Sequence, residues 1–157
     1  MNILAIDPGP EQSAIVYLDG RVRSFIVDNE VAARHVMEST FDVLAIESVA
    51  CFGMPVGAEV FSTCEWIGIF CWVWARHSLG DILRIPRTQI KNALCGSARA
   101  KDSNIRQALI DRFGGSRAAA MGTKAKPGPL YGVKSHAWSA LAVAVVAEQM
   151  LREKNGE

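Results

Sequence analysis

The chain has little excess charge, no cysteine motif and no long hydrophobic run. It carries 17 Lys and Arg against 16 Asp and Glu, so its net charge of +1 does not by itself indicate a polyanionic partner. The four cysteines form no CxxC pair and no zinc-type pairing with histidine, which suits a reducing compartment. The longest apolar block, residues 66–75, is too short to span a bilayer, and the N-terminus has no basic segment before its apolar run. We therefore expect a soluble cytoplasmic protein without a signal peptide.

The length and composition fit one domain. A chain of 157 residues can bury a substantial core but leaves little room for a second one. Half of its residues are hydrophobic and 21% are charged, which is typical of a globular protein. No internal repeat or low-complexity segment interrupts the chain. We therefore predict a single domain over residues 1–157.

Two apolar segments each end in a carboxylate. Residues 3–6 lead to Asp7, and the following Pro-Gly pair turns the chain out of a sheet. Residues 43–46 lead in the same way to Glu47. If these strands lie side by side, the two carboxylates repel each other unless a cation lies between them, and a divalent metal with oxygen ligands is the usual solution. Two solvated strand ends are the alternative.

Hydrophobic periodicity predicts an α/β fold. We expect strands over residues 2–7, 14–18, 21–27, 41–48 and 81–86, and helices over residues 30–39, 58–77, 88–94, 102–113 and 134–154. The first three strands would form an antiparallel meander, and a helical crossover lets the fourth lie parallel to the first. We place helix caps at Asn29, at Thr88 and at either Asp102 or Ser103. Residues 115–132, rich in Gly, Ala, Pro and Lys, are expected to form a mobile basic loop.

The helix expected over residues 58–77 is apolar nearly all round. Phe61, Trp66, Phe70 and Trp72 belong to it, and almost no polar stripe separates them. Because a chain of this size rarely encloses such a helix, we expect the part from Phe61 to Ala75 to pair two copies in a homodimer. Complete packing within one chain is the alternative.

Basic residues are concentrated in the second half of the chain. From Arg76 to Lys134 there are twelve Lys and Arg against three acids, Asp81, Asp102 and Asp111. A surface of this kind favours phosphate, and hence nucleic acid, as its ligand, although an ordinary solvated face is the alternative. The candidate nucleic-acid contacts are Lys91, Arg99, Lys101, Lys124, Lys126 and Lys134.

The start of the last predicted helix carries His136 and Ser139. They are three residues apart and so share one face, and small alanines behind them allow close packing against the sheet. A neutral imidazole at this place could ligate a metal held by Asp7 and Glu47. A cap or a surface residue is the alternative for a histidine at a helix start.

Together these features resemble the RuvC-type Holliday junction resolvases, particularly their phage-borne relatives. The resemblance rests on the strand ends Ile6-Asp7-Pro8-Gly9 and Ala45-Ile46-Glu47, the segments around Lys91 and Lys101, and the alanine-rich final helix. It covers nearly the whole chain in element order. It implies a ribonuclease H-like fold with a five-stranded mixed sheet flanked by helices, a homodimer, and cleavage of four-way DNA junctions in a bacterial or phage-infected cytoplasm.

The resemblance also assigns roles to residues. Asp7 would lie between two Mg²⁺ or Mn²⁺ ions, Glu47 would be a further ligand, and His136 would be the first member of the ligand pair on the closing helix. Lys91 and Lys101 would hold the scissile strand near the site. The metals would activate a water for attack on phosphorus, and hydrolysis would leave a 5′ phosphate and a 3′ hydroxyl.

Ser139 departs from this pattern, which has aspartate three residues after the position of His136. A hydroxyl binds a hard cation more weakly than a carboxylate, so we expect Ser139 to act through water. Three explanations fit. In the one that we favour, water or phosphate oxygens complete the coordination of the metal. Otherwise, the protein binds junctions without cutting them, or the serine is an introduced change. Glu148 is about 18 Å further along the same helix and cannot replace the acid, whereas Asp102 is a conceivable substitute.

Phe52, in the loop after Glu47, is a candidate wedge that stacks on bases at the crossover, with core packing as the alternative. Three other functions fit parts of the sequence: a non-catalytic junction-binding protein with a degenerate metal site, a ribonuclease acting on RNA–DNA hybrids, and an actin-like or sugar-kinase-like phosphate binder. The last needs two such domains around a nucleotide, and this chain has length for one.

Overall fold

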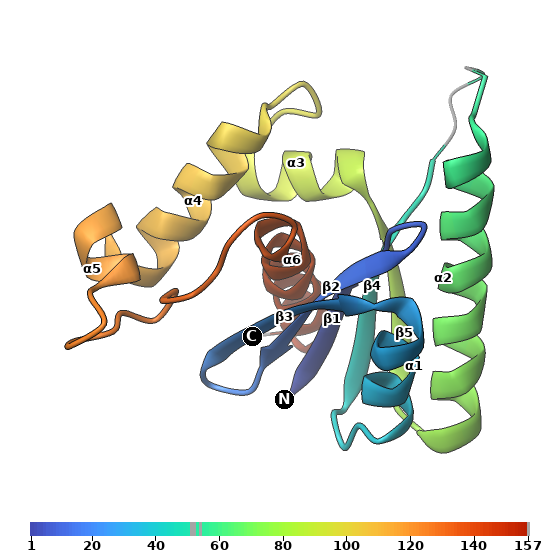
Figure 1. Ribbon diagram of the computed structural model, residues 1–157. Helices are drawn as coiled ribbons and strands as arrows, with labels where there is room; N and C mark the ends of the chain where they lie inside the picture. Colours follow the sequence, from blue (N-terminus) through green and yellow to red (C-terminus); the bar gives the residue numbers. More distant parts are fainter. Residues whose placement is uncertain (51–52, 54, 157) are drawn as a thin grey trace.

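Five strands form a single mixed sheet in the computed structural model, which describes residues 1–50, 53 and 55–156 (Figure 1). The strands β1 (Ile3–Asp7), β2 (Gln12–Leu18) and β3 (Val22–Asp28) form the predicted antiparallel meander. β4 (Val43–Ser48) runs parallel to β1, and β5 (Asp81–Pro86) runs parallel to β4. The strand order is β3-β2-β1-β4-β5, which confirms the predicted five-stranded mixed sheet.

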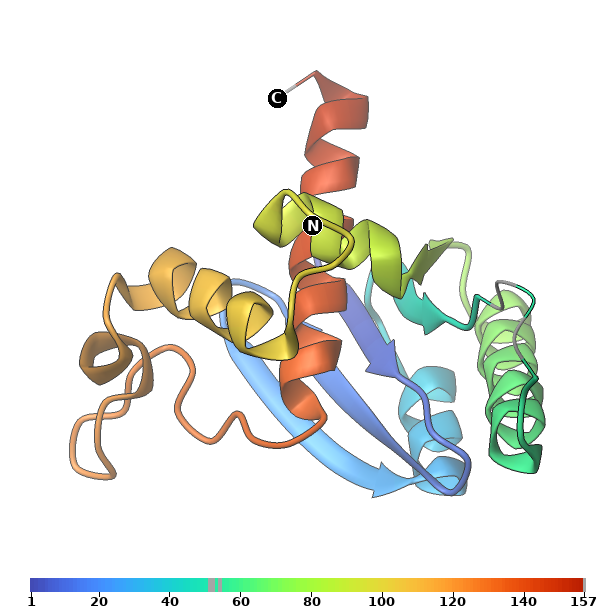
Figure 2. The same cartoon turned by 90° about the horizontal axis from the view of Figure 1, so that it is seen from above.

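Helices cover both faces of this sheet (Figures 1 and 2). The side chains of β1 alternate between the two layers, as the pleat of a strand requires. Ile3 and Ala5 lie in the core that includes α6 (Ala137–Asn155), while Leu4 and Ile6 lie in the core that includes α1 (Asn29–Met37) and α2 (Ala58–His77). The two helices α3 (Arg87–Cys95) and α4 (Asp102–Gly114) complete the first layer.

The helix α6 is deeply buried and made mostly of small residues. Ten of its 19 residues are buried, and all ten are Ala, Val or Leu, so the helix packs closely on β1 and β2. It begins at Ala137 rather than at the predicted position 134, with His136 as the N-cap residue. This packing fixes the start of the helix above the end of β1.

The predicted helix caps are wrong. Asp28 precedes α1 and Pro86 precedes α3, so these helices begin directly where β3 and β5 end. Lys101 is the N-cap residue of α4, and its backbone N–H donates to the side-chain oxygen of Asn104. For α1 and α3 the end of the preceding strand therefore sets where the helix starts, and the local preference of polar residues for caps does not decide it.

The basic segment over residues 115–132, expected to be a mobile loop, is partly helical, and its mobility stays a prediction. The segment contains α5 (Arg117–Met121), capped by the Ser116 hydroxyl, and its Ala120 and Leu130 are buried. A Cβ on Gly128 would lie 2.4 Å from backbone oxygens of α5. The small residues of this segment therefore allow close backbone packing.

The helix α2 has the predicted bounds but buries only one face. Phe70 and Trp74 are buried against the sheet, whereas Phe61, Ile69 and Trp72 are 61%, 40% and 65% exposed. Complete packing of this helix within one chain is therefore ruled out, and the homodimer stays a prediction. Within the described residues, none of the helices combines the length and the apolar character needed to cross a bilayer.

Candidate active site

Asp7 and Glu47 lie at the same edge of the sheet. In the parallel pair of β1 and β4, Ile6 is the partner of Ile46, so the next residues, Asp7 and Glu47, lie at the same level of the sheet. Both side chains are largely buried, with 15% and 17% of their surface exposed. Burial raises the pKa of Asp7, and burial together with the nearby charge of Asp7 raises the pKa of Glu47 to about 7.

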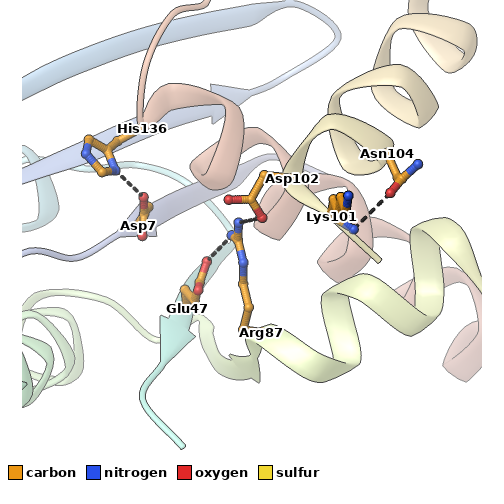
Figure 3. Close-up of polar contacts among 7 residues, drawn as sticks. All are labelled: Asp7, Glu47, Arg87, Lys101, Asp102, Asn104 and His136. Atoms are coloured by element: carbon orange, nitrogen blue, oxygen red, sulfur yellow. Dashed lines mark hydrogen bonds and ion pairs between the residues drawn. The ribbon is translucent and has the colours of Figure 1, made fainter. Parts of the chain in front are cut away.

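The imidazole of His136 faces this pair of acids. Its Nδ1 lies 3.4 Å from Oδ2 of Asp7, while three quarters of the side chain is open to solvent (Figure 3). The charges of His136 and Arg87, and hydrogen bonds from His136 and Ser139, partly oppose the effect of burial on the pKa of Asp7. Asp7, His136 and Ser139 are therefore brought together although they are far apart in sequence.

A strained backbone position directly precedes the imidazole. Ser135 has a φ of 47°, and it is the one non-glycine residue with positive φ in the described part of the chain. An L-residue adopts this conformation at a cost, which the close packing of α6 can offset. The turn at Ser135 therefore sets the direction in which His136 leaves the backbone.

Asn29 supports the turn after Asp7, a role that sequence reasoning missed. Its fully buried side chain donates to the carbonyl oxygen of Gly9 at 2.9 Å and accepts from the Ser13 hydroxyl at 2.6 Å. A Cβ on Gly9 would lie 2.4 Å from the carbonyl oxygen of Gln12, so the turn has room for glycine only. Ser13 and Asn29 are the two buried polar residues among those described. An asparagine at the start of a helix was read as a cap, and no signal in the sequence pointed to this partner.

Arg87 is the other site residue that sequence reasoning missed. Its Nη1 lies 3.0 Å from Oε2 of Glu47, and its Nη2 lies 2.7 Å from Oδ1 of Asp102 (Figure 3). The register of β4 with β5 pairs Ser48 with Pro86, so Arg87 follows β5 at the edge that holds the acids. Its place directly after a strand parallel to β4 was the available signal.

The donors at this edge include groups that suit a divalent cation. Two carboxylates and an imidazole are suitable ligands for Mg²⁺ or Mn²⁺, and a cation would reverse the upward pKa shifts of Asp7 and Glu47. However, Arg87 already bonds one oxygen of Glu47, and Ser139 offers a hydroxyl in place of an acid. Within the described residues, no three His, Cys, Asp or Glu side chains are gathered as a metal site.

The predicted nucleic-acid contacts fall into two groups. Lys91, Arg99 and Lys101 lie on α3, on the turn after it and at the start of α4, close to Asp102, while Lys134 lies in the turn before α6. The pKa of Asp102 is lowered mainly by its hydrogen bond from Arg87 and also by the charges of Lys91 and Arg106. Residues Lys124 and Lys126 belong to the segment beyond α5, at the outer end of the molecule in both views (Figures 1 and 2). Phe52 lies outside the described residues.

The sheet order, the helix layers and the strand-end acids define a RuvC-like fold of the ribonuclease H-like class. Thermus thermophilus RuvC has a TM-score of 0.71 and 18% identity to this chain, with 98% of this chain and 97% of that chain covered. T. thermophilus RuvC in complex with Holliday junction substrate has a TM-score of 0.71 and 19% identity, with coverage of 98% and 96%. No protein-family model and no curated protein matches the sequence. The predicted fold is confirmed by structure alone.

The raised pKa of Glu47 predicts that the metal-free protein loses stability as pH rises. A carboxyl group that titrates near 7 when folded and near 4.5 when unfolded stabilises the folded state fully below pH 4.5. This stabilisation is lost between pH 4.5 and 7, at a cost of about 3 kcal/mol or less. Denaturant unfolding in the presence of a chelator should show this decrease in the free energy of unfolding. The decrease should be much smaller in Glu47→Gln, which cannot ionise at this position. If the free energy of unfolding of Glu47→Gln fell with pH as steeply as that of the wild type, the raised pKa of Glu47 would be contradicted.

Proposed function

We propose that the protein is a metal-dependent, structure-selective DNA endonuclease that resolves four-way junctions or related branched DNA by phosphodiester hydrolysis. The observation that carries this proposal is the buried pair of Asp7 and Glu47, faced by His136 at one edge of the sheet. The fold supports it, because a structural neighbour with the same arrangement of elements was solved with a Holliday junction substrate. Buried acids whose pKa values are raised are typical of functional sites.

Asp7, Glu47 and His136 would hold the divalent cation, Mg²⁺ or Mn²⁺, with Ser139 acting through water. When bound, the cation lowers the pKa of a water and neutralises charge on the leaving oxygen. The burial of Asp7 and Glu47 keeps their carboxylates fixed and limits competition from solvent. The exposed imidazole of His136 borders the opening through which a phosphate group would enter.

The basic residues around the site would hold the substrate by its backbone. Lys91, Arg99, Lys101 and Lys134 lie on α3, on the turn after it, at the start of α4 and in the turn before α6. These segments also carry Arg87, Asp102 and His136, so we expect the four basic residues to neutralise phosphates next to the cleaved bond. The segment beyond α5, which contains Lys124 and Lys126, lies further out, where it would contact another arm of a branched duplex (Figure 2). Such contacts read the shape of DNA more than its bases.

The exposed face of α2 would join two copies in a homodimer. Its large apolar residues Ile69 and Trp72 lie near the middle of the helix. Glu65 lies nearer the N-terminal end of the same face, and Arg76 lies nearer its C-terminal end. In an antiparallel pairing about a point between residues 70 and 71, Ile69 of each copy meets Trp72 of the other, and Glu65 meets Arg76. The face is therefore self-complementary in charge, as a two-fold interface requires. Two sites would then act on a symmetric junction.

A non-catalytic junction-binding protein is the second candidate function. The observation that favours it is the ion pair of Arg87 with Glu47, which places a positive side chain where a metal ligand is expected. Ser139 also favours a non-catalytic protein, because a serine at this position gives the site one negative charge fewer than an aspartate would. The two functions share the same fold and the same basic surface, so cleavage itself must separate them.

Cleavage of a synthetic four-way junction tests the proposed function. We expect the wild type to cut with Mn²⁺ or Mg²⁺ and Asp7→Asn to lose at least about a hundredfold in rate, because the cation loses its buried carboxylate. Asp81→Asn, an exposed acid at the start of β5, is the matched control and should cut normally. Equal cutting by Asp7→Asn would overturn the site. Junction binding by the wild type with no cutting in either metal would establish the second candidate.

The homodimer is tested by a charge placed on the exposed face of α2. Trp72→Glu should convert a dimer into a monomer in sedimentation equilibrium, because an ionised carboxylate would be buried in the interface. Tyr131→Glu changes an aromatic residue of comparable exposure outside α2 and should leave the dimer intact. A wild type that sediments as a monomer, or a Trp72→Glu variant that remains dimeric, would contradict the interface.

A further inference from the structure

The guanidinium of Arg87 joins two acids of the candidate active site. It donates to Glu47 through Nη1 and to Asp102 through Nη2, at 3.0 and 2.7 Å. Glu47 is 17% exposed and Asp102 is 75% exposed, so Arg87 reaches from the interior of the site to its mouth. A group with fixed positive charge that binds two carboxylates by separate donors holds them together as a bridging cation does.

Arg87 also lies between two hollows of the surface. One hollow, of about 240 Å³, is lined by Asp7, Glu47 and Arg87 together with the ends of β1 and β4. The other, of about 200 Å³, is lined by Arg87, Asp102, His136 and Ser139. The arginine therefore stands at the boundary between the places where a first and a second cation would lie.

The charges at the two hollows are unequal. The first hollow has the buried pair Asp7 and Glu47, and among the described residues Oε1 of Glu47 accepts no hydrogen bond. The second hollow has the hydroxyl of Ser139 and an Asp102 whose charge Arg87 already balances. A divalent cation is therefore attracted to the first hollow, beside Asp7, whose Oδ2 lies 3.4 Å from Nδ1 of His136. The second hollow offers it little net negative charge.

We propose that Arg87 takes the place of one divalent cation, so that each chain binds a single Mg²⁺ or Mn²⁺ instead of the two that the resemblance implies. The guanidinium neutralises the side of Glu47 that faces Asp102, and Ser139 needs no negative charge because no second ion has to be held. The two departures from the expected site, an arginine beside Glu47 and a serine at 139, thus have one cause. This inference rests on the metal site of the proposed function, but not on cleavage.

Counting bound Mn²⁺ by electron paramagnetic resonance, without DNA and at fixed pH, tests the proposal. We expect one Mn²⁺ per chain for the wild type and for Arg87→Lys, which keeps the positive charge. The double variant Arg87→Gln, Ser139→Asp should bind two, because it frees Glu47 and Asp102 and adds a carboxylate. Arg84→Gln, which removes an exposed arginine of β5, is the matched control and should bind one.

The outcomes separate this inference from the proposed function. Two Mn²⁺ in the wild type would overturn the role of Arg87 and leave the metal-dependent nuclease in place. One Mn²⁺ in the double variant, with a circular dichroism spectrum like that of the wild type, would overturn it as well. One ion in the wild type and two in the double variant would support the role of Arg87 even if the wild type cut no junction. No bound Mn²⁺ in the wild type would overturn both.

Discussion

The repulsion between two buried carboxylates is the constraint on which the rest of the site depends. Asp7 and Glu47 leave adjacent parallel strands at one edge of the sheet, and little solvent reaches either of them. Charges in such surroundings need a positive partner or must take up protons. Arg87 supplies part of that positive charge at Glu47, the imidazole of His136 faces Asp7, and a divalent cation would supply the remainder. The proposed metal site answers this need for positive charge.

The fold holds the two acids in place from several directions. The small residues of α6 bring His136 down onto the end of β1, while the buried hydrogen bonds of Asn29 hold the turn that follows Asp7. The strand β5 delivers Arg87 directly to the neighbouring strand end. None of these contacts lies close in sequence to another, so the site exists only when the whole sheet is formed.

The sequence predicted what depends on periodicity and composition. The five strands, the mixed sheet and the bounds of α2 were predicted from hydrophobic periodicity, and the RuvC-like fold was implied by the resemblance. It did not predict the roles of Arg87 and Asn29, because each contacts residues at least 15 positions away, and a local reading makes them a surface charge and a cap. The short helix within residues 115–132 was not predicted, because composition alone does not distinguish small residues that allow close packing, such as Gly122 and Gly128, from those of an irregular loop. The metal roles of Asp7, Glu47 and His136 stay predictions.

The titration of Glu47 tests the central claim most directly. In the metal-free protein, carbon NMR of the side-chain carboxyl should show a midpoint at about 7, because burial and the charge of Asp7 both favour the protonated form. Saturating Mg²⁺ should move the midpoint well below that value, since a bound cation favours the carboxylate. A midpoint near the ordinary 4.5 in the metal-free protein, unmoved by Mg²⁺, would contradict the account.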